Sequence, residues 1–220
     1  MTQVRPSIED DTPAILDISR AEPLFSAEDV ECVEELLEDF FDDPDEEDYT
    51  FLTADGSGEV AGYACYGPTP LTKGTFDLYW ICVGPNHRRQ GVGQMLLAAV
   101  EAAVQEQGGR LVTIDTSGLP AFRGTRAFYE GCGYLAGSRV PDFYGPGDDL
   151  VKYYRHLSNG HVPRESAMAQ GEREGIAAPI DEDAMVHTLP ASLLMEADSH
   201  PAFPLSSEGG SRSAQARKEG

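Results

Sequence analysis

The segment 77–93, DLYWICVGPNHRRQGVG, restricts the possible folds of this chain more than any other segment. An apolar strand at 78–83 runs into a basic, glycine-spaced turn at 88–93. Apolar residues then recur at spacings of three and four through 92–103, which is typical of one face of an amphipathic helix. A strand, a glycine turn and a helix N-terminus in direct succession form a site for an anion, because the first helical N–H groups have no intrahelical partner.

The spacing of this turn excludes two well-known phosphate loops. A Walker loop needs Gly-Lys-[Ser/Thr], which the sequence lacks, and a dinucleotide fingerprint needs a third glycine where Leu96 stands. What remains is Arg88-x-x-Gly91-x-Gly93 after Val-x-Pro. This pattern resembles the pyrophosphate loop of the GNAT N-acetyltransferases, which bind acetyl-CoA. The alternative is an ordinary strand-to-helix turn, in which the glycines only allow the backbone conformation of the turn.

The order of the expected elements extends this resemblance over about residues 3–157. Periodicity and turn residues predict a strand, two helices, three strands, a helix, a strand, a helix and two strands, the last two joined by a loop at 140–149. The GNAT order implies an α/β fold with a mixed, mostly antiparallel twisted sheet of about six to seven strands. About four helices would flank the sheet, with the fourth and fifth strands splayed apart. We therefore expect a GNAT domain at 1–157.

The composition changes after this domain. Residues 158–220 are rich in Ser, Gly, Ala, Pro and charge, with little periodicity, so we expect a disordered tail. One island in it, 185–194 (MVHTLPASLL), has enough apolar residues to dock on a partner or on the chain itself. A tail that is solvated throughout is the alternative.

The resemblance assigns cofactor binding to two groups of residues. The loop and the first helical turn would hold the pyrophosphate through Arg88, Arg89, Gln90, Gly91, Val92, Gly93 and Gln94. Free backbone amides of the splayed fourth strand would meet the thioester and the pantetheine arm, namely those of Ile81, Cys82 and Val83. The alternative is that these amides are paired within the sheet. Acetyl-CoA is the implied cosubstrate, and four dispersed cysteines without a CxxC pair give no reason to expect a metal.

Tyr129 is the general acid that the resemblance implies. The segment 127–134, AFYEGCGY, resembles a family signature whose tyrosine often faces the CoA sulfur. A phenol with a pKa of about 10 suits the protonation of an alkyl thiolate. A core tyrosine that packs a helix on the sheet is the alternative.

Asp77 is the first candidate for the general base, and Asp115 is the second. Asp77 stands six residues before Val83, which is the spacing of a catalytic glutamate in the histone-type branch of the family. Strand alternation would place four residues on one face, namely Asp77, Tyr79, Ile81 and Val83. Asp115 occupies the place of an acid found in ribosomal-protein alanine acetyltransferases. A strand-edge acid paired with an arginine is the alternative for Asp77, and many relatives move the proton through water instead.

The segment 141–149 is aromatic and acidic, and in the family this region flanks the acceptor. It could hold an amine by cation–π and ion-pair contacts through Phe143, Tyr144, Asp148 and Asp149. A tight turn rich in Gly and Pro is the alternative.

The charge distribution narrows the choice of partners. The net charge is −22, and residues 1–50 hold 18 of the 38 acidic residues and only two of the 16 basic ones. This pattern favours a solvated acidic face, or a rim that attracts a cationic acceptor such as a polyamine or a basic peptide. Nucleic acid would be repelled. No stretch reaches the ~20 apolar residues of a membrane span, and the N-terminus lacks an apolar signal region, so we expect a cytoplasmic protein.

These observations lead to one expectation and one alternative. We expect an acetyl-CoA-dependent N-acetyltransferase that moves the acetyl group directly to a primary amine in a ternary complex. A small amine or amino-acid metabolite ranks first as acceptor, and a protein N-terminus or lysine second. The alternative is a non-catalytic CoA-binding module that recruits a partner. Family members often dimerise through sheet edges, so a homodimer is compatible with this reading.

Overall fold

The computed structural model describes residues 2–42, 48–56 and 58–157, together with the backbone of 186–187. The described strands and helices are β1 Thr2–Pro6, α1 Thr12–Arg20, α2 Ala27–Asp42, β2 Thr50–Gly56, β3 Glu59–Pro68, β4 Thr75–Val83, α3 Val92–Glu106, β5 Leu111–Ser117, α4 Arg123–Gly131, β6 Leu135–Gly145, β7 Asp148–His156 and β8 Val186–His187. Three short 3-10 turns lie between them, at η1 Glu9–Asp11, η2 Pro85–His87 and η3 Pro120–Phe122. None of the described helices is both long enough and apolar enough to cross a membrane.

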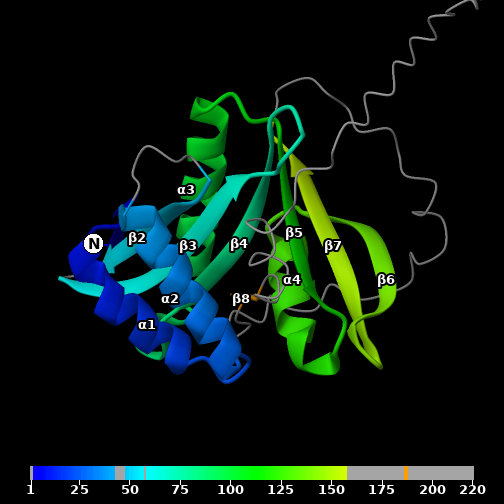
Figure 1. The fold of residues 1–220 in the computed structure, drawn as a ribbon, viewed down its shortest axis with the longest axis horizontal. Coiled ribbons are helices and arrows are strands. Elements are labelled where there is room, and N and C mark those ends of the chain that lie inside the picture. The colour runs from blue at the N-terminus through cyan, green and yellow to red at the C-terminus, as the bar shows by residue number, and fades with distance from the viewer. Residues whose placement is uncertain (1, 43–47, 57, 158–185, 188–220) are drawn as a thin grey trace, which may run out of the picture.

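The strands form one mixed sheet (Figure 1). Its order is β1-β2-β3-β4-β5-β7-β6, and β8 pairs with β4 off this path. The β4–β5 pair is parallel, and the other pairs among the described strands are antiparallel. The predicted α/β fold class, with a mostly antiparallel sheet and four helices among the described residues, is confirmed.

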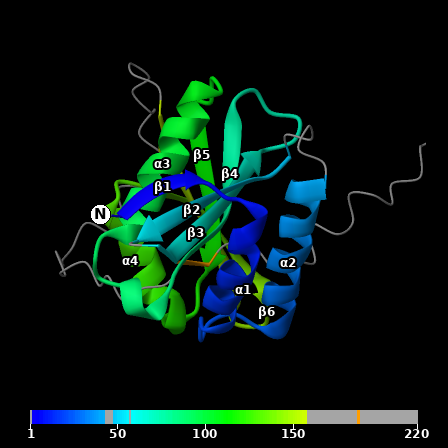
Figure 2. The same ribbon diagram turned by 90° about the vertical axis from the view of Figure 1, so that its left-hand side faces the viewer.

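Helices cover both faces of the sheet (Figure 2). On one face, α3 buries Leu96 and Val100 in a cluster that also contains residues of α4. On the other face, α1 and α2 bury a second cluster that includes Val33, Leu37 and the chain's single tryptophan, Trp80. The central strands are therefore apolar on both faces, as expected for strands that are covered on both sides.

A bulge in β4 changes which residues share a face. Cys65 of β3 pairs with Trp80 and the next β3 residue pairs with Leu78, so Tyr79 is the extra residue in β4. Tyr79 and Trp80 consequently both lie in the α1/α2 cluster, whereas Ile81 belongs to the α3 cluster. Strand alternation predicts that Asp77, Tyr79, Ile81 and Val83 share one face. This prediction is wrong for Ile81 and Val83, which pack in the α3 cluster, because the bulge inserts one residue into the alternation.

The segment 140–149 is a strand hairpin and not the expected joining loop. β6 continues to Gly145 and β7 begins at Asp148, so the connection is much shorter than predicted. Register is lost between Val140 and Gly145, where Asp142 takes a left-handed conformation with φ 55°. The side chain of Asp149 accepts the Asp142 N–H at 3.0 Å, which holds this irregular stretch on β7.

Candidate functional site

The glycine turn leads directly from β4 into α3. Gly91 is the N-cap residue of α3, with φ 78° and ψ 6°, and a Cβ at this position would meet no other atom within 4 Å. Arg89 also has a positive φ of 59° and is exposed. Gly93 lies against Phe128 of α4, since a Cβ there would approach the ring to 3.3 Å. The turn therefore presents the first N–H groups of α3 at the surface, which suits the binding of an anion.

One of the two loop arginines is turned inward. Arg88 reaches Glu22 in the connection between α1 and α2, with 3.3 Å between Nη2 and Oε2. The Glu22 side chain is only 1% exposed, and it also accepts the Leu24 N–H at 3.0 Å. Sequence reasoning expected Arg88 to face phosphate and gave no role to Glu22. The structure instead joins the glycine turn to the α1–α2 connection, through a contact that spans 66 positions in the sequence.

β4 and β5 separate after three paired residues. Pairing joins Thr75, Phe76 and Asp77 to residues 111–113, and none of the described residues of β5 pairs with β4 beyond that point. The expected splay between these strands is therefore present, and Figure 1 shows the strands diverging from their upper ends. Ile81 and Cys82 are buried on the diverging part of β4.

The hydroxyl of Tyr129 lies buried without a hydrogen-bond partner among the described residues. Tyr129 belongs to α4 and is 0% exposed. Its ring packs between those of Tyr134 and Tyr153, at centroid distances of 6.0 and 5.8 Å. Burial, followed by the neighbouring Tyr134, raises the pKa of Tyr129 well above the ordinary value, so the phenol keeps its proton at neutral pH. A buried polar atom left unpaired in this way requires an explanation, such as a catalytic role.

The two candidate bases lie near each other where β4 and β5 begin to separate. Asp77 accepts hydrogen bonds from the hydroxyls of Thr69, at 2.6 Å, and of Thr113. Asp115, two residues further along β5, forms an ion pair with Lys152 of β7 at 2.6 Å. Burial raises the pKa of Asp115, Lys152 opposes this shift, and the charge of Asp77 adds to it. The partners of Asp77 among the described residues are these two threonines, and not the arginine of the alternative prediction.

Two of the four predicted acceptor residues lie beside β5: Tyr144 near Asp115, and Asp148 near Ser117. The hydroxyl of Tyr144 is buried without a partner among the described residues, and burial together with the charges of Asp115 and Asp148 raises the pKa of Tyr144. Asp148 accepts a hydrogen bond from Ser117 at 2.5 Å. Phe143 contacts this group through the Tyr144 ring.

Asp149 and Phe143, the other two predicted acceptor residues, lie on the β6–β7 hairpin. Asp149 forms an ion pair with Arg139 at 2.5 Å and accepts the Asp142 N–H, and these two contacts hold its pKa below the ordinary value. Asp149 therefore stabilises the β6–β7 hairpin. Phe143 is 42% exposed and meets the Tyr144 ring edge-on at 5.0 Å.

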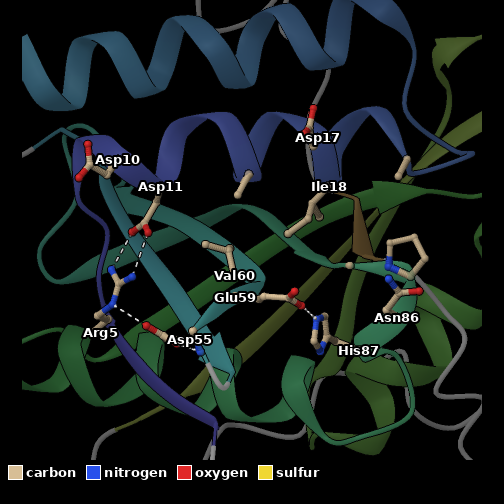
Figure 3. Close-up of a pocket in the computed structure, with 15 residues that line it drawn as sticks. Arg5, Asp10, Asp11, Asp17, Ile18, Asp55, Glu59, Val60, Asn86 and His87 are labelled. Carbon is tan, nitrogen blue, oxygen red and sulfur yellow. Dashed lines mark hydrogen bonds and ion pairs between the residues drawn. The ribbon is translucent and has the colours of Figure 1, made fainter.

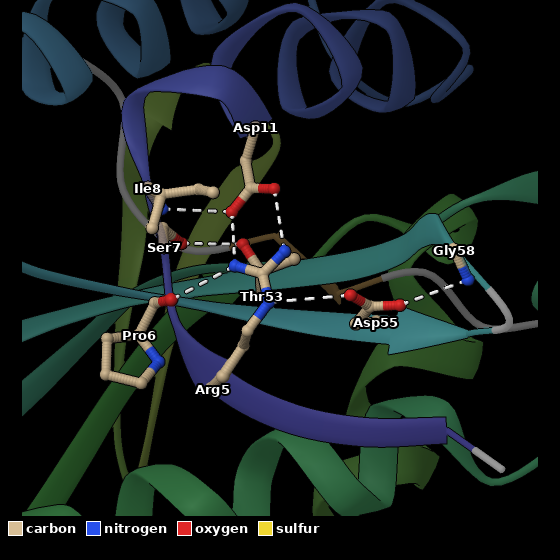
Figure 4. A network of polar contacts seen from close by, with 8 residues as sticks. All are labelled: Arg5, Pro6, Ser7, Ile8, Asp11, Thr53, Asp55 and Gly58. Carbon is tan, nitrogen blue, oxygen red and sulfur yellow. Dashed lines mark hydrogen bonds and ion pairs between the residues drawn. The ribbon is translucent and has the colours of Figure 1, made fainter.

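A separate cleft of about 620 Å³ lies between α1, the β2–β3 turn and η2 (Figure 3). Arg5 donates to both carboxylate oxygens of Asp11, at 2.7 and 2.9 Å, and approaches Asp55 at 3.5 Å (Figure 4). His87 approaches Glu59 at 3.8 Å. Much of the charge in this cleft is thus paired, and none of the predicted site residues lines it. Within the described part of the chain, no three His, Cys, Asp or Glu side chains converge as a metal site would require.

Comparisons with known proteins agree with this geometry. The model of the acetyltransferase (GNAT) family matches residues 13–134. A GNAT-family protein from Desulfovibrio desulfuricans is 35% identical, with a TM-score of 0.70, and the match covers 72% of this chain and 100% of that one. No curated protein sequence matches significantly.

Two more distant structures share the fold. The ribosomal-protein-S18-alanine N-acetyltransferase of Escherichia coli is 18% identical with a TM-score of 0.57, covering 74% of this chain and 99% of that one. The yncA protein of Salmonella typhimurium, solved with its cofactor acetyl-CoA, is 19% identical with a TM-score of 0.58, covering 76% and 99%.

Proposed function

The chain belongs to the GNAT acetyltransferase family, and from this premise we propose that it transfers the acetyl group of acetyl-CoA directly to a primary amine. The observation that carries the proposal is that β5 leaves one edge of β4 after Asp77, and that α4 carries a buried tyrosine hydroxyl without a hydrogen-bond partner among the described residues. Both features suit a bound thioester: the edge offers backbone amides to its carbonyl and pantetheine arm, and the phenol offers a proton to its sulfur.

The glycine turn would hold the cosubstrate by its phosphates. We assign this contact to the N–H groups around Gly91 and Gly93 and to the exposed Arg89, Gln90 and Gln94. Arg88 would act differently, because its guanidinium is paired with the buried Glu22. Its proposed role is to fix the turn against the α1–α2 connection, which keeps the helix N-terminus in place.

The transfer can be written with named atoms and groups. The amine nitrogen bonds to the thioester carbon while the carbon–sulfur bond breaks, Tyr129 gives its proton to the departing sulfur, and Asp115 accepts the proton that the amine loses. Asp77 would stand beside it, fixed by two threonine hydroxyls. Asp115 is preferred as the proton acceptor because burial raises its pKa towards the pH at which an enzyme works.

Direct transfer requires that no side chain take the acetyl group. Cys82 lies on β4 close to the expected thioester position, but it is 1% exposed and burial raises its pKa strongly. A thiol that stays protonated is a poor nucleophile. The four cysteines are all unpaired, as a reducing compartment would leave them, and we propose the cytoplasm as that compartment.

The acceptor would approach along β5, where the charges of Asp77 and Tyr144 interact with that of Asp115. Asp148 lies beside the end of the same strand, where it accepts a hydrogen bond from Ser117. This acidic and aromatic surface suits a cation, and we rank a small amine or amino-acid metabolite above a protein N-terminus or lysine. The E. coli structural neighbour acts on a protein alanine, so both classes are tested.

The deciding experiment measures free thiol released from acetyl-CoA in the presence of pooled amines. The pools are polyamines, amino acids, aminoglycosides, and peptides with a free N-terminus or lysine, each at low and high salt because the net charge is −22. Thiol release with one pool establishes the activity and narrows the acceptor. If no pool releases thiol while calorimetry confirms acetyl-CoA binding, the proposal is contradicted and a non-catalytic CoA-binding module is favoured.

A further inference from the structure

The diverging part of β4 has one edge that β5 does not cover. β5 leaves β4 after Asp77, whereas β3 pairs along the other side of β4 as far as Val83. Backbone N–H and C=O groups on an open edge readily accept another extended segment. This edge is the one that the proposed function assigns to the thioester and the pantetheine arm.

β8 is seated on this edge. Val186 pairs with Ile81 and His187 pairs with Trp80, in the antiparallel direction. β8 also contacts β5 and α4, the helix that carries Tyr129. In Figure 1, β8 lies between the lower end of β4 and α4. It therefore occupies the space between the strand that carries the amides and the helix that carries the proposed acid.

We propose that Val186–His187 is an internal competitor of acetyl-CoA for the open edge of β4. The inference rests on the proposed function, because it takes this edge to be the cosubstrate slot. Ile81 cannot pair with Val186 and also turn the same backbone edge to a thioester. Acetyl-CoA would therefore bind only when β8 has left, and the end of the chain would regulate access to the site.

The covalent link makes this competition effective. Residues 158–185 join β8 to the domain, so docking is intramolecular and its effective concentration is of the order of millimolar. A ligand that binds only the open form has its apparent affinity reduced by the fraction of molecules that are open. Removing β8 from the edge should therefore tighten acetyl-CoA binding, by about threefold to tenfold if 70–90% of molecules are closed.

The test removes the backbone donors of β8 from the full-length chain. The double variant Val186→Pro/His187→Pro has no N–H at either paired position and cannot continue a strand there. The matched control, Ala167→Pro/Met168→Pro, places two prolines elsewhere in the same tail. Hydrogen exchange of the β4 amides is measured without ligand, and the dissociation constant of acetyl-CoA is measured by calorimetry.

We expect the β8 variant to bind acetyl-CoA more tightly and to show faster exchange at the one residue of the Trp80–Ile81 pair whose N–H points towards β8. The N–H of the other residue points towards β3 and should keep its protection. The control should be unchanged from wild type. Unchanged exchange would show that β8 does not dock, and faster exchange with unchanged affinity would show that it docks outside the cosubstrate slot; either result overturns the inference. Protection of β4 that rises with protein concentration would also overturn it, because the strand would then come from a second copy. If no variant binds acetyl-CoA, the proposed function fails, while the exchange data still decide whether β8 docks.

Discussion

Replacing Tyr129 with phenylalanine separates a catalytic role of its hydroxyl from a structural one. The substitution removes one oxygen atom that has no partner among the described residues and keeps the ring between Tyr134 and Tyr153. An unsatisfied buried polar group costs about 1–3 kcal/mol of stability. The free energy of unfolding of Tyr129→Phe should therefore equal that of the wild type or exceed it by about 1 kcal/mol.

The same substitution should impair turnover strongly. General acid catalysis contributes about 10²–10⁴ in rate, so kcat should fall at least ~100-fold, or about 2.7 kcal/mol in activation free energy. The KM for acetyl-CoA should change little, since the ring and the phosphate-binding turn are untouched. Urea denaturation gives the stability, and thiol release with the identified acceptor gives kcat and KM.

Tyr153→Phe is the matched control. Tyr153 is also a core tyrosine, at 2% exposure, but its hydroxyl donates to Glu130 at 2.7 Å. This variant should lose about 1–2 kcal/mol of stability and keep its kcat. If Tyr129→Phe keeps kcat within about threefold, the general-acid assignment is wrong. If it instead loses stability as Tyr153→Phe does, the Tyr129 hydroxyl has a structural partner.

Three further variants test other parts of the structure. Asp11→Asn should lower the free energy of unfolding by about 2 kcal/mol at pH 7. Burial raises the pKa of Asp11, but hydrogen bonds from Arg5 and the Ile8 amide lower it overall. The stabilisation is therefore present above the pKa of the unfolded state and disappears as the pH falls through the pKa of the folded state. Urea denaturation at pH 7 and pH 3 should show the difference from wild type closing, and a constant difference would contradict this. Gly91→Ala should cost about 1 kcal/mol because φ is 78°, and Gly91→Asn should cost less, as thermal unfolding will show. If Asp115 is the base, kcat should fall on acidification with an apparent pKa above that of an ordinary aspartate, and Asp115→Asn should remove this limb of the pH–rate profile.

Much of the fold follows from the sequence because each element carries its own local signal. At the start of α2, the Asp29 carboxylate accepts the Ser26 N–H at 2.7 Å and the Ser26 hydroxyl accepts the Asp29 N–H at 3.1 Å. A Ser followed three residues later by an acid predicts such a capping box from local sequence alone. The strand, glycine turn and helix of 77–93 form as expected for the same reason. These signals depend on neighbouring residues and need no knowledge of distant contacts.

The features that sequence reasoning missed depend on partners far away in the chain. Nothing in the strand pattern reveals the bulge at Tyr79, because it arises from the register with β3. The sequence predicts a phosphate contact for Arg88 but does not reveal its partner Glu22, because Glu22 lies far away in the connection between α1 and α2. The contacts of Asp149 with Arg139 and Asp142 likewise form only once β6 and β7 pair.

The net charge of −22 leads to a prediction about how acetyl-CoA reaches the site. The ligand's phosphates meet a helix N-terminus and a basic turn at short range, but at long range they face a strongly negative protein. Raising the ionic strength from about 0.01 to 0.1 M shortens the screening length from about 30 to 10 Å, which removes the long-range repulsion more than the contacts at the turn. The association rate constant measured by stopped flow should therefore rise with salt, opposite to the usual behaviour of an anion and a basic site. A rate that falls with salt would show that the turn dominates the field on the approach path. The acidic segment 1–50 would then have to face away from the path of the cosubstrate, and the acceptor would be the ligand that this segment attracts.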